Sequence, residues 1–314
     1  MLFFQKLKYQ YYRLCCCVTC GQLKDKFYQK KLNTKNKLAQ ILINHDLIYN
    51  AICRQSYTNQ RLILASVVNK KAFSEYKACF RGKDIVLIAA GPTVNDFVPV
   101  KNSIYVGCNR AFLLDNIKFD FLFAIDKVGI QNCYNEFFNY EKENCTKFIG
   151  DQNLGVDYQI PEDIIPINNK IHRYITNAGI STEISYYPLD ISILPLLNPP
   201  TVSLQAMQFI LWTQPKRIFI VGVDCTCVTG KHFKGSDTDC SFRNENLMNN
   251  DKVSIESYKM LKEFAQTYYP QTEIISVNPI GLKGIFKDVY TKPYINKNKN
   301  IIEELGDNLK IFEE

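Results

Sequence analysis

The chain of 314 residues has the length of one large α/β domain with an extension, or of two modest domains. Its hydrophobic content of 46% and charged content of 22% are typical of a folded globule and argue against a disordered chain. Charge is unevenly distributed: residues 1–80 hold 14 Lys and Arg against 3 Asp and Glu, and the remainder holds 24 against 28. The acidic remainder argues against nucleic acid as the main ligand.

Residues 1–80 are expected to form a basic, helical N-terminal extension. Apolar residues recur at near-helical spacing within 38–52 and 62–68 and predict two or three helices. The opening segment mixes apolar, basic and cysteine side chains. It predicts either a frayed basic terminus or a peripheral contact with the anionic inner face of a membrane.

Cysteine usage and hydropathy indicate the compartment. The 12 cysteines are scattered, and Cys108 and Cys225 fall in strand-like apolar runs with no leader-like segment before them. We therefore expect reduced thiols in the cytoplasm. No uninterrupted apolar stretch reaches the ~18 residues that a spanning helix needs, so a membrane crossing is not expected.

Residues 81–290 have the pattern of an α/β domain. Short apolar runs predict buried strands, and the stretches at 201–213 and 252–268 between them predict helices. The predicted strands cover 84–90, 103–108, 121–125, 217–223 and 273–277. This alternation predicts a parallel sheet flanked by helices. The proline-rich residues 150–200 are interpreted as a lid insertion, and 291–314 as a C-terminal tail.

Polar or small residues follow the predicted strands. In a parallel sheet the carboxyl ends of the strands share one edge, where ligands bind. The residues expected at this edge are Gly91, Pro92, Thr93, Asn109, Asp126, Asp224 and Asn278. The competing interpretation is ordinary turn preference, because Gly, Asn and Asp commonly end strands.

Gly91 precedes a predicted helix start. Thr93 and Asp96 fit a capping box, and a helix N-terminus beside a glycine would offer N–H donors to a phosphate. The segment has neither the G-x-G-x-x-G nor the Walker pattern, which disfavours an NAD-type or P-loop protein.

The remaining polar residues at this edge suit a nucleotide. Asn109 offers a donor and an acceptor to a ribose or a base. Asp126 and Asp224 are candidates for accepting hydroxyls, acting as a base or holding Mg²⁺, and a capping role for Asp224 stays open. Thr201 and Ser203, at the start of the helix after two prolines, form a second candidate phosphate site.

His232 is the candidate general base. It follows Lys231 in a glycine-flanked loop beyond Asp224, and the chain has only three histidines. A surface histidine without a role is the alternative. No structural zinc site is expected, because Cys17-x-x-Cys20 has no second pair nearby.

These motifs, in this order, resemble a known family. Gly91-Pro92-Thr93, the segment ending in Asn109, Thr201-Val-Ser203 and Gly222-Val-Asp224 with a following Gly-x-His loop resemble the bacterial sialyltransferases of glycosyltransferase family 42. They are also similar to the related hydroxymethylpterin pyrophosphokinase-like and surface-glycan proteins. The resemblance covers roughly residues 83–285.

The resemblance implies a Rossmann-like domain that binds a CMP-sugar and transfers the sugar with inversion, without an essential metal or other cofactor. The implied acceptor is a bacterial surface glycan of the lipopolysaccharide or capsule type. Gly91 and Thr93 would contact the phosphate or ribose, and Asn109 the cytidine. Thr201 and Ser203 would lie near the donor phosphate or sugar carboxylate, Asp224 near the nucleotide, and His232 would deprotonate the acceptor.

Two departures from the family pattern are visible. The first loop reads Ala89-Ala90-Gly91 without the family's asparagine, and Cys225 stands where an aromatic residue is expected. Lys231 or Lys234 would then supply the positive charge near the leaving phosphate. Two alternatives stay open: an ATP- and Mg²⁺-dependent pyrophosphokinase-like enzyme that uses Asp126 and Asp224, or a non-catalytic nucleotide-sugar-binding protein.

Overall fold

The structure, a computed structural model, describes residues 2–18, 21–125, 127–130, 133–151, 160, 164–177, 187–198, 201–225, 233 and 245–312. The chain divides into two compact units, Met1–Asn59 and Gln60–Glu314. Helix α1 (Leu2–Val18) belongs to the first unit, and helix α2 (Gly21–Phe73) contributes to both. The expected helical extension is present, and its opening segment is helical.

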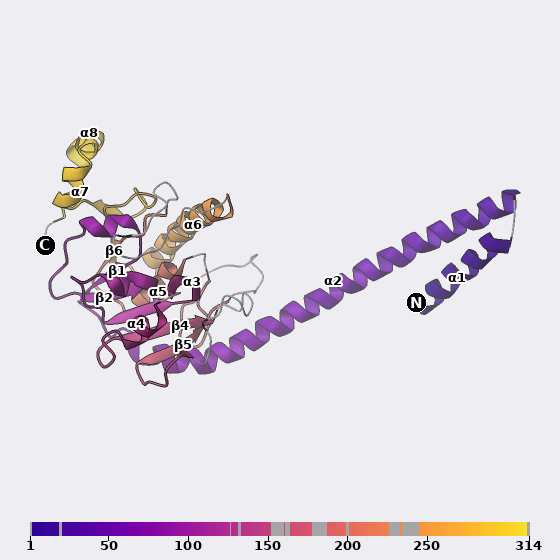
Figure 1. Cartoon of the computed structure of the whole chain (residues 1–314), viewed down its shortest axis with the longest axis horizontal. Coiled ribbons are helices and arrows are strands. Elements are labelled where there is room, and N and C mark those ends of the chain that lie inside the picture. The colour runs from indigo at the N-terminus through magenta and orange to yellow at the C-terminus, as the bar shows by residue number, and fades with distance from the viewer. Residues whose placement is uncertain are drawn as a thin grey trace. The chain divides into compact units, whose positions relative to one another are not determined.

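One eight-stranded sheet dominates the second unit (Figure 1). The strand order is β5-β4-β3-β2-β1-β6-β7-β8, and every neighbouring pair is parallel. The strands are β1 (Asp84–Ile88), β2 (Ile104–Cys108), β3 (Phe121–Ala124), β4 (Thr146–Asp151), β5 (Ile171–Ile175), β6 (Arg217–Val221), β7 (Glu273–Val277) and β8 (Lys287–Val289). The predicted Rossmann-like α/β class is confirmed.

Three strands were not predicted, and the composition of two of them explains why. The edge strand β5 reads Ile-His-Arg-Tyr-Ile, and β8 is only three residues long with Lys and Asp in it. Neither has the continuous apolar run of a central parallel strand. Residues 150–200 are therefore not simply an insertion, since β5 and the end of β4 lie within them.

Helices and short 3₁₀ turns cover both faces of the sheet. The helices are α3 (Lys127–Ile130), α4 (Tyr134–Asn139), α5 (Val202–Trp212), α6 (Glu245–Tyr268), α7 (Lys292–Lys297) and α8 (Asn300–Leu305). The 3₁₀ turns are η1 (Ser74–Tyr76), η2 (Pro92–Asp96), η3 (Asn109–Leu113) and η6 (Gly306–Asn308). In β1, Leu87 packs into the core that contains α5, and Val86 packs into the core on the opposite face. This alternation is why β1 is apolar throughout.

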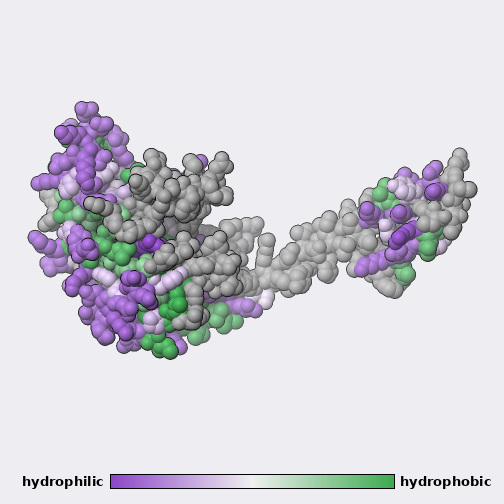
Figure 2. Space-filling view, viewed as in Figure 1, coloured by the Kyte–Doolittle hydropathy of each residue, from purple (hydrophilic) through white to green (hydrophobic). Residues whose placement is uncertain are grey.

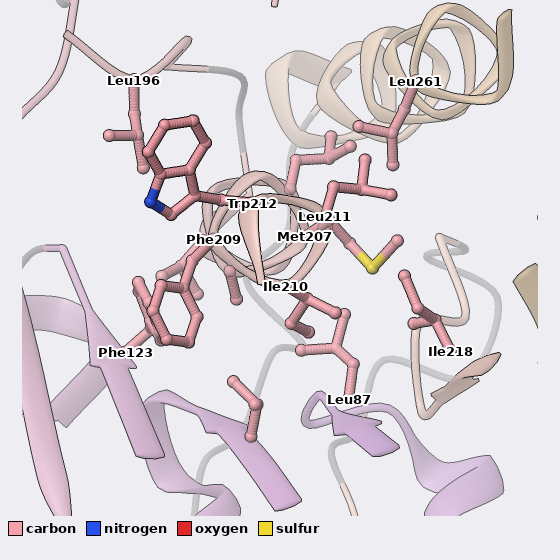
Figure 3. Packing of buried hydrophobic residues seen from close by; sticks show 14 of the residues in the cluster. Leu87, Phe123, Leu196, Met207, Phe209, Ile210, Leu211, Trp212, Ile218 and Leu261 are labelled. Atoms are coloured by element: carbon pink, nitrogen blue, oxygen red, sulfur yellow. The ribbon is translucent and has the colours of Figure 1, made fainter. Parts of the chain in front are cut away.

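Helix α5 is the centre of one core. Each of its residues is buried, because the sheet covers one side and other helices cover the rest. Figure 3 shows Met207, Phe209 and Ile210 of α5 between the sheet and neighbouring elements. A helix that is apolar all round is a buried helix, so no strand-facing stripe was readable in the sequence.

Both expected boundaries of the central domain lie inside packed structure. Ala72 and Phe73 belong to the core, and the indole Nε1 of Trp212 donates to the carbonyl of Phe73 at 3.1 Å. The second unit therefore begins at residue 60 rather than near 80. Residues 291–312 of the expected C-terminal tail are also packed on the domain: the N–H of Phe312 donates to the carbonyl of Tyr290 at 2.9 Å.

Within the described ranges, no helix has both the length and the hydropathy to cross a bilayer.

Candidate functional site

The strand order reverses between β1 and β6. The chain builds β1 to β5 outward on one side and then returns to place β6 on the other side of β1. In open α/β sheets, ligands bind outside the carboxyl ends of the strands at such a reversal. Gly91 and Thr93 follow β1, and Asp224 follows β6, so three predicted residues meet there.

Two glycines allow the loops after β1 and β6 to touch. The N–H of Gly91 donates to the carbonyl of Gly222 at 2.8 Å. A Cβ at Gly91 would lie 2.5 Å from that carbonyl oxygen and 2.5 Å from Oδ2 of Asp224. Gly222 has a φ of +69°, a left-handed conformation that favours glycine. The sequence motif Gly222-Val-Asp224 thus reflects backbone geometry.

Asp224 braces the loop that follows β1. Its carboxylate accepts the hydroxyl of Thr93 at 2.5 Å and the N–H of Thr93 at 3.2 Å, and the residue is 6% exposed. Burial raises the pKa of Asp224, and the two bonds from Thr93 oppose that shift. The carboxylate is therefore held between the loops that follow β1 and β6.

The predicted capping box at Thr93 is wrong. The segment is the five-residue 3₁₀ turn η2, whose cap makes no side-chain hydrogen bond, and Pro92 is its first residue. Thr93 bonds to Asp224, and the carboxylate of Asp96 pairs with Lys297. The α-helix N-terminus that was expected to bind a phosphate at Gly91 does not form. The side chains of Thr93 and Asp96 instead bond to residues far away in the chain.

We expect Thr93→Val to destabilise the protein in a pH-dependent way. Loss of the hydroxyl raises the pKa of Asp224 further, because the ionised form loses a donor. Below the ordinary value of 3.8 the carboxyl is protonated in the folded and unfolded states, so the extra cost is absent. As pH rises above that value toward neutrality, the loss should grow to about 1–3 kcal/mol. Urea unfolding at acidic and neutral pH measures it.

Thr213→Val is the matched control for that measurement. The Thr213 hydroxyl is also fully buried but donates to a neutral acceptor, the carbonyl of Ile210, at 2.7 Å. Its loss should cost about 1 kcal/mol at every pH. An equal pH profile for the two variants would contradict the bracing role of Asp224.

Asn109 carries an acceptor without a donor. It follows β2 in a left-handed conformation with φ of 51°, and its buried Oδ1 has no hydrogen-bond partner among the described residues. A Cβ on Gly129, in α3, would lie 2.4 Å from this oxygen. Buried acceptors are normally satisfied, so this atom suits a donor from a ligand hydroxyl or base.

Thr201 and Ser203, the second candidate phosphate site, lie at the start of α5. Thr201 is its N-cap, and the Thr201 hydroxyl accepts the N–H of Ser203 at 3.4 Å. The Ser203 hydroxyl lies 2.9 Å from that of Thr201 and accepts the hydroxyl of Tyr258 at 2.8 Å. Ser203 is 1% exposed, so its side chain serves packing, and Thr201 is the partly exposed member of the pair.

Asn278 stabilises the fold. Its side chain donates to the Thr291 hydroxyl at 3.0 Å and accepts the N–H of Thr291 at 2.8 Å, and it is 1% exposed. Thr291 in turn is the N-cap of α7 and donates to the carbonyl of Asp96. Because both ends of the amide are used, Asn278 does not belong with the ligand-facing residues.

The candidate general base lies outside the described residues, as do Lys231 and Asp126. The next residue, Phe233, is described: it is 2% exposed, and its N–H donates to the carbonyl of Ala90 at 3.0 Å. Ala90 immediately precedes Gly91. The residue that follows His232 in the chain is therefore anchored at the end of β1.

Sequence reasoning missed Tyr258 and Tyr294. Tyr258 is fully buried, and burial followed by the nearby Cys225 raises its pKa. Burial, followed by the negative charges of Asp224 and Asp96, raises the pKa of Tyr294. Tyr294 also lines a surface cavity of about 390 Å³, together with Pro279, the residue after Asn278. The position of Tyr258 on the inner face of a predicted helix could have indicated its burial. No sequence feature indicated Tyr294.

The described residues contain no group of three or more His, Cys, Asp or Glu side chains arranged to hold a metal ion. No protein-family model matches the chain, and no curated protein is significantly similar to it in sequence. The parallel sheet and its reversal of strand order between β1 and β6 define a Rossmann-like α/β protein.

Proposed function

We propose that the protein transfers a sugar from a nucleotide-sugar, CMP-linked by resemblance, to a bacterial surface glycan acceptor in the cytoplasm. The observation that carries the proposal is the meeting of Gly91, Thr93 and Asp224 where the strand order reverses. This is the position at which doubly wound sheets bind nucleotides. The unsatisfied oxygen of Asn109 lies after the neighbouring strand and suits the nucleoside.

The proposed mechanism is a direct displacement. His232 removes the proton from the acceptor hydroxyl, whose oxygen bonds to the anomeric carbon as the bond from that carbon to the phosphate oxygen breaks. The nucleotide phosphate departs as an anion. The N–H groups at the start of α5 beside Thr201, together with Lys231, would stabilise that charge.

A ligand panel tests the binding half of the proposal. We expect CMP to raise the unfolding temperature of the full chain more than UDP, GDP or ATP, because a specific ligand stabilises the folded state by mass action. Asn109→Ala should reduce the CMP shift without abolishing folding. Equal shifts for all four nucleotides, or none, would rule out a CMP-specific site.

We expect His232→Ala to lower sugar transfer at least ~10²-fold while CMP affinity stays nearly unchanged, as for the loss of a general base. His45→Ala is the matched control, since His45 lies in the other unit and has no proposed role. Steady-state transfer assays and CMP titrations give the two quantities. Undiminished turnover in His232→Ala would leave a non-catalytic binding protein as the better description.

Chelation separates the transferase from the pyrophosphokinase-like alternative. Transfer should persist in EDTA, whereas ATP- and Mg²⁺-dependent chemistry would stop. Both carboxylate oxygens of Asp224 accept hydrogen bonds from Thr93 in a buried position, and this competes with coordination of Mg²⁺. The geometry of Asp224 therefore favours the metal-independent transferase.

A further inference from the structure

The first unit begins with two helices that contact each other. The rings of Tyr12 in α1 and Phe27 in α2 lie 6.4 Å apart, and the Nζ of Lys30 lies 5.9 Å from the centre of the Tyr12 ring. We call α1 and residues 21–37 of α2 the N-terminal hairpin. Tyr12 therefore marks the face of α1 that packs against α2.

A different face of α1 carries exposed apolar side chains. Leu7 is 52% exposed, Tyr11 59% and Leu14 67%. Their spacing of four and three residues places them on one side of the helix, within about 60° of arc. We call these three residues the apolar stripe. Large apolar side chains gathered in this way mark a surface that meets an apolar phase or a partner.

Basic side chains border the apolar stripe. Lys6, Lys8 and Arg13 are exposed and, at about 100° per residue, fall on its two sides. Across residues 6–37 there are nine Lys and Arg against one acidic residue, Asp25. Figure 2 shows hydrophilic and hydrophobic residues next to each other on the visible surface of this unit. An apolar strip edged by long cationic side chains is the pattern of a helix that lies in a membrane interface.

We propose that the N-terminal hairpin docks on a bilayer surface rich in anionic lipid. The apolar stripe enters the boundary between headgroups and acyl chains, and the bordering basic side chains contact lipid phosphates. Three apolar side chains give weak insertion by themselves, so charge attraction supplies much of the binding. Each basic residue near an anionic surface strengthens partitioning about five-fold.

Charge favours lipid over a second copy of the chain. Two hairpins placed stripe to stripe would bring their lysines and arginines together, and like charges at close range oppose association. An anionic bilayer reverses the sign of that term. The proposal does not depend on the proposed enzymatic function, and its test requires no nucleotide or sugar.

Vesicle co-sedimentation of the full chain tests the proposal. We expect binding to vesicles in which about a third of the lipid is phosphatidylglycerol, and little binding to pure phosphatidylcholine. Raising the salt from about 0.1 M to about 0.5 M should weaken binding, because it shortens the screening length. The charge variant Lys6→Gln, Lys8→Gln, Arg13→Gln should lower partitioning about 10²-fold.

A second variant isolates the apolar stripe. Leu7→Gln, Tyr11→Gln, Leu14→Gln keeps the net charge and good helix formers, and it should lower partitioning at least ~10-fold at low salt. The control variant Lys70→Gln, Lys142→Gln, Lys252→Gln removes three exposed charges from the second unit and should bind nearly as wild type. Circular dichroism confirms that each variant retains its helices.

Three outcomes would overturn the inference. The first is equal binding to neutral and anionic vesicles or no binding at all, and the second is equal loss in the control and charge variants. The third is a dimer in analytical ultracentrifugation that the stripe variant dissolves, which would assign the apolar stripe to a second copy of the chain.

Discussion

Replacement of Arg61 by methionine is expected to lower the free energy of unfolding by about 3 kcal/mol, because a partly buried ion pair is broken and buried carbonyls lose their donor. Arg61 is 3% exposed and lies in the last part of α2. Its guanidinium donates to the carboxylate of Asp151 at 2.8 Å and to the carbonyls of Asp151 and Thr176 at 3.0 Å and 2.6 Å. Methionine fills the space but supplies none of these donors.

The position of these acceptors explains the size of the effect. Asp151 ends β4, and Thr176 directly follows β5, the edge strand of the sheet. An edge strand presents unpaired backbone groups, and Arg61 and Asn69 satisfy those at the carboxyl end of β5: the N–H of Ile175 donates to Oδ1 of Asn69 at 2.7 Å. Without the guanidinium, buried acceptors lose their donor and the edge loosens.

Lys118→Met is the matched control for Arg61→Met. Lys118 pairs with Glu141 at 3.4 Å, but its side chain is 87% exposed, so the loss should stay within about 1 kcal/mol. Arg61→Lys should fall between them, because lysine keeps the charge but not the planar fork. Urea unfolding monitored by circular dichroism gives all three values. A similar loss in Arg61→Met and Lys118→Met would contradict a structural role for the bonds that Arg61 makes.

We expect Gly91→Ala to lower the free energy of unfolding by about 3 kcal/mol, at the upper end for an overpacked site. The added Cβ meets the Gly222 carbonyl and the Asp224 carboxylate at 2.5 Å, closer than real contacts allow. The φ of Gly91 is −67°, which alanine adopts freely, so the cost is steric rather than conformational. The loops must separate, and if the proposed CMP site lies here, Gly91→Ala should abolish the thermal shift expected with CMP.

Gly82→Ala separates the two kinds of glycine cost. Gly82 has a φ of +77°, and a Cβ added there would meet nothing within 4 Å, so alanine should cost about 1 kcal/mol from backbone strain. Adding Asp224→Ala to Gly91→Ala should recover only part of the loss, since the clash with the Gly222 carbonyl persists. Equal costs for Gly82→Ala and Gly91→Ala would mean that the two loops part easily.

The sequence determined the central sheet and the edge at which the candidate site lies. All five predicted strands form, and Gly91, Thr93 and Asp224 meet where the strand order reverses. The physical reason is that strands buried on both faces must be apolar along their length. Such continuous apolar runs, bounded by turn residues, can be recognised in the sequence. The polar residue after each run then falls at the same edge without further information.

The tertiary structure decided which partners the polar side chains choose. Thr93 bonds to Asp224 from 131 positions away rather than to its own turn, and Asn278 is used by Thr291. Strand β5 pairs at the edge although it contains His172 and Arg173, because α2 supplies Arg61 and Asn69 to its end. Hydrogen-bond partners depend on which groups lie close together in space and on which of them are removed from water. Neither can be read from the local sequence.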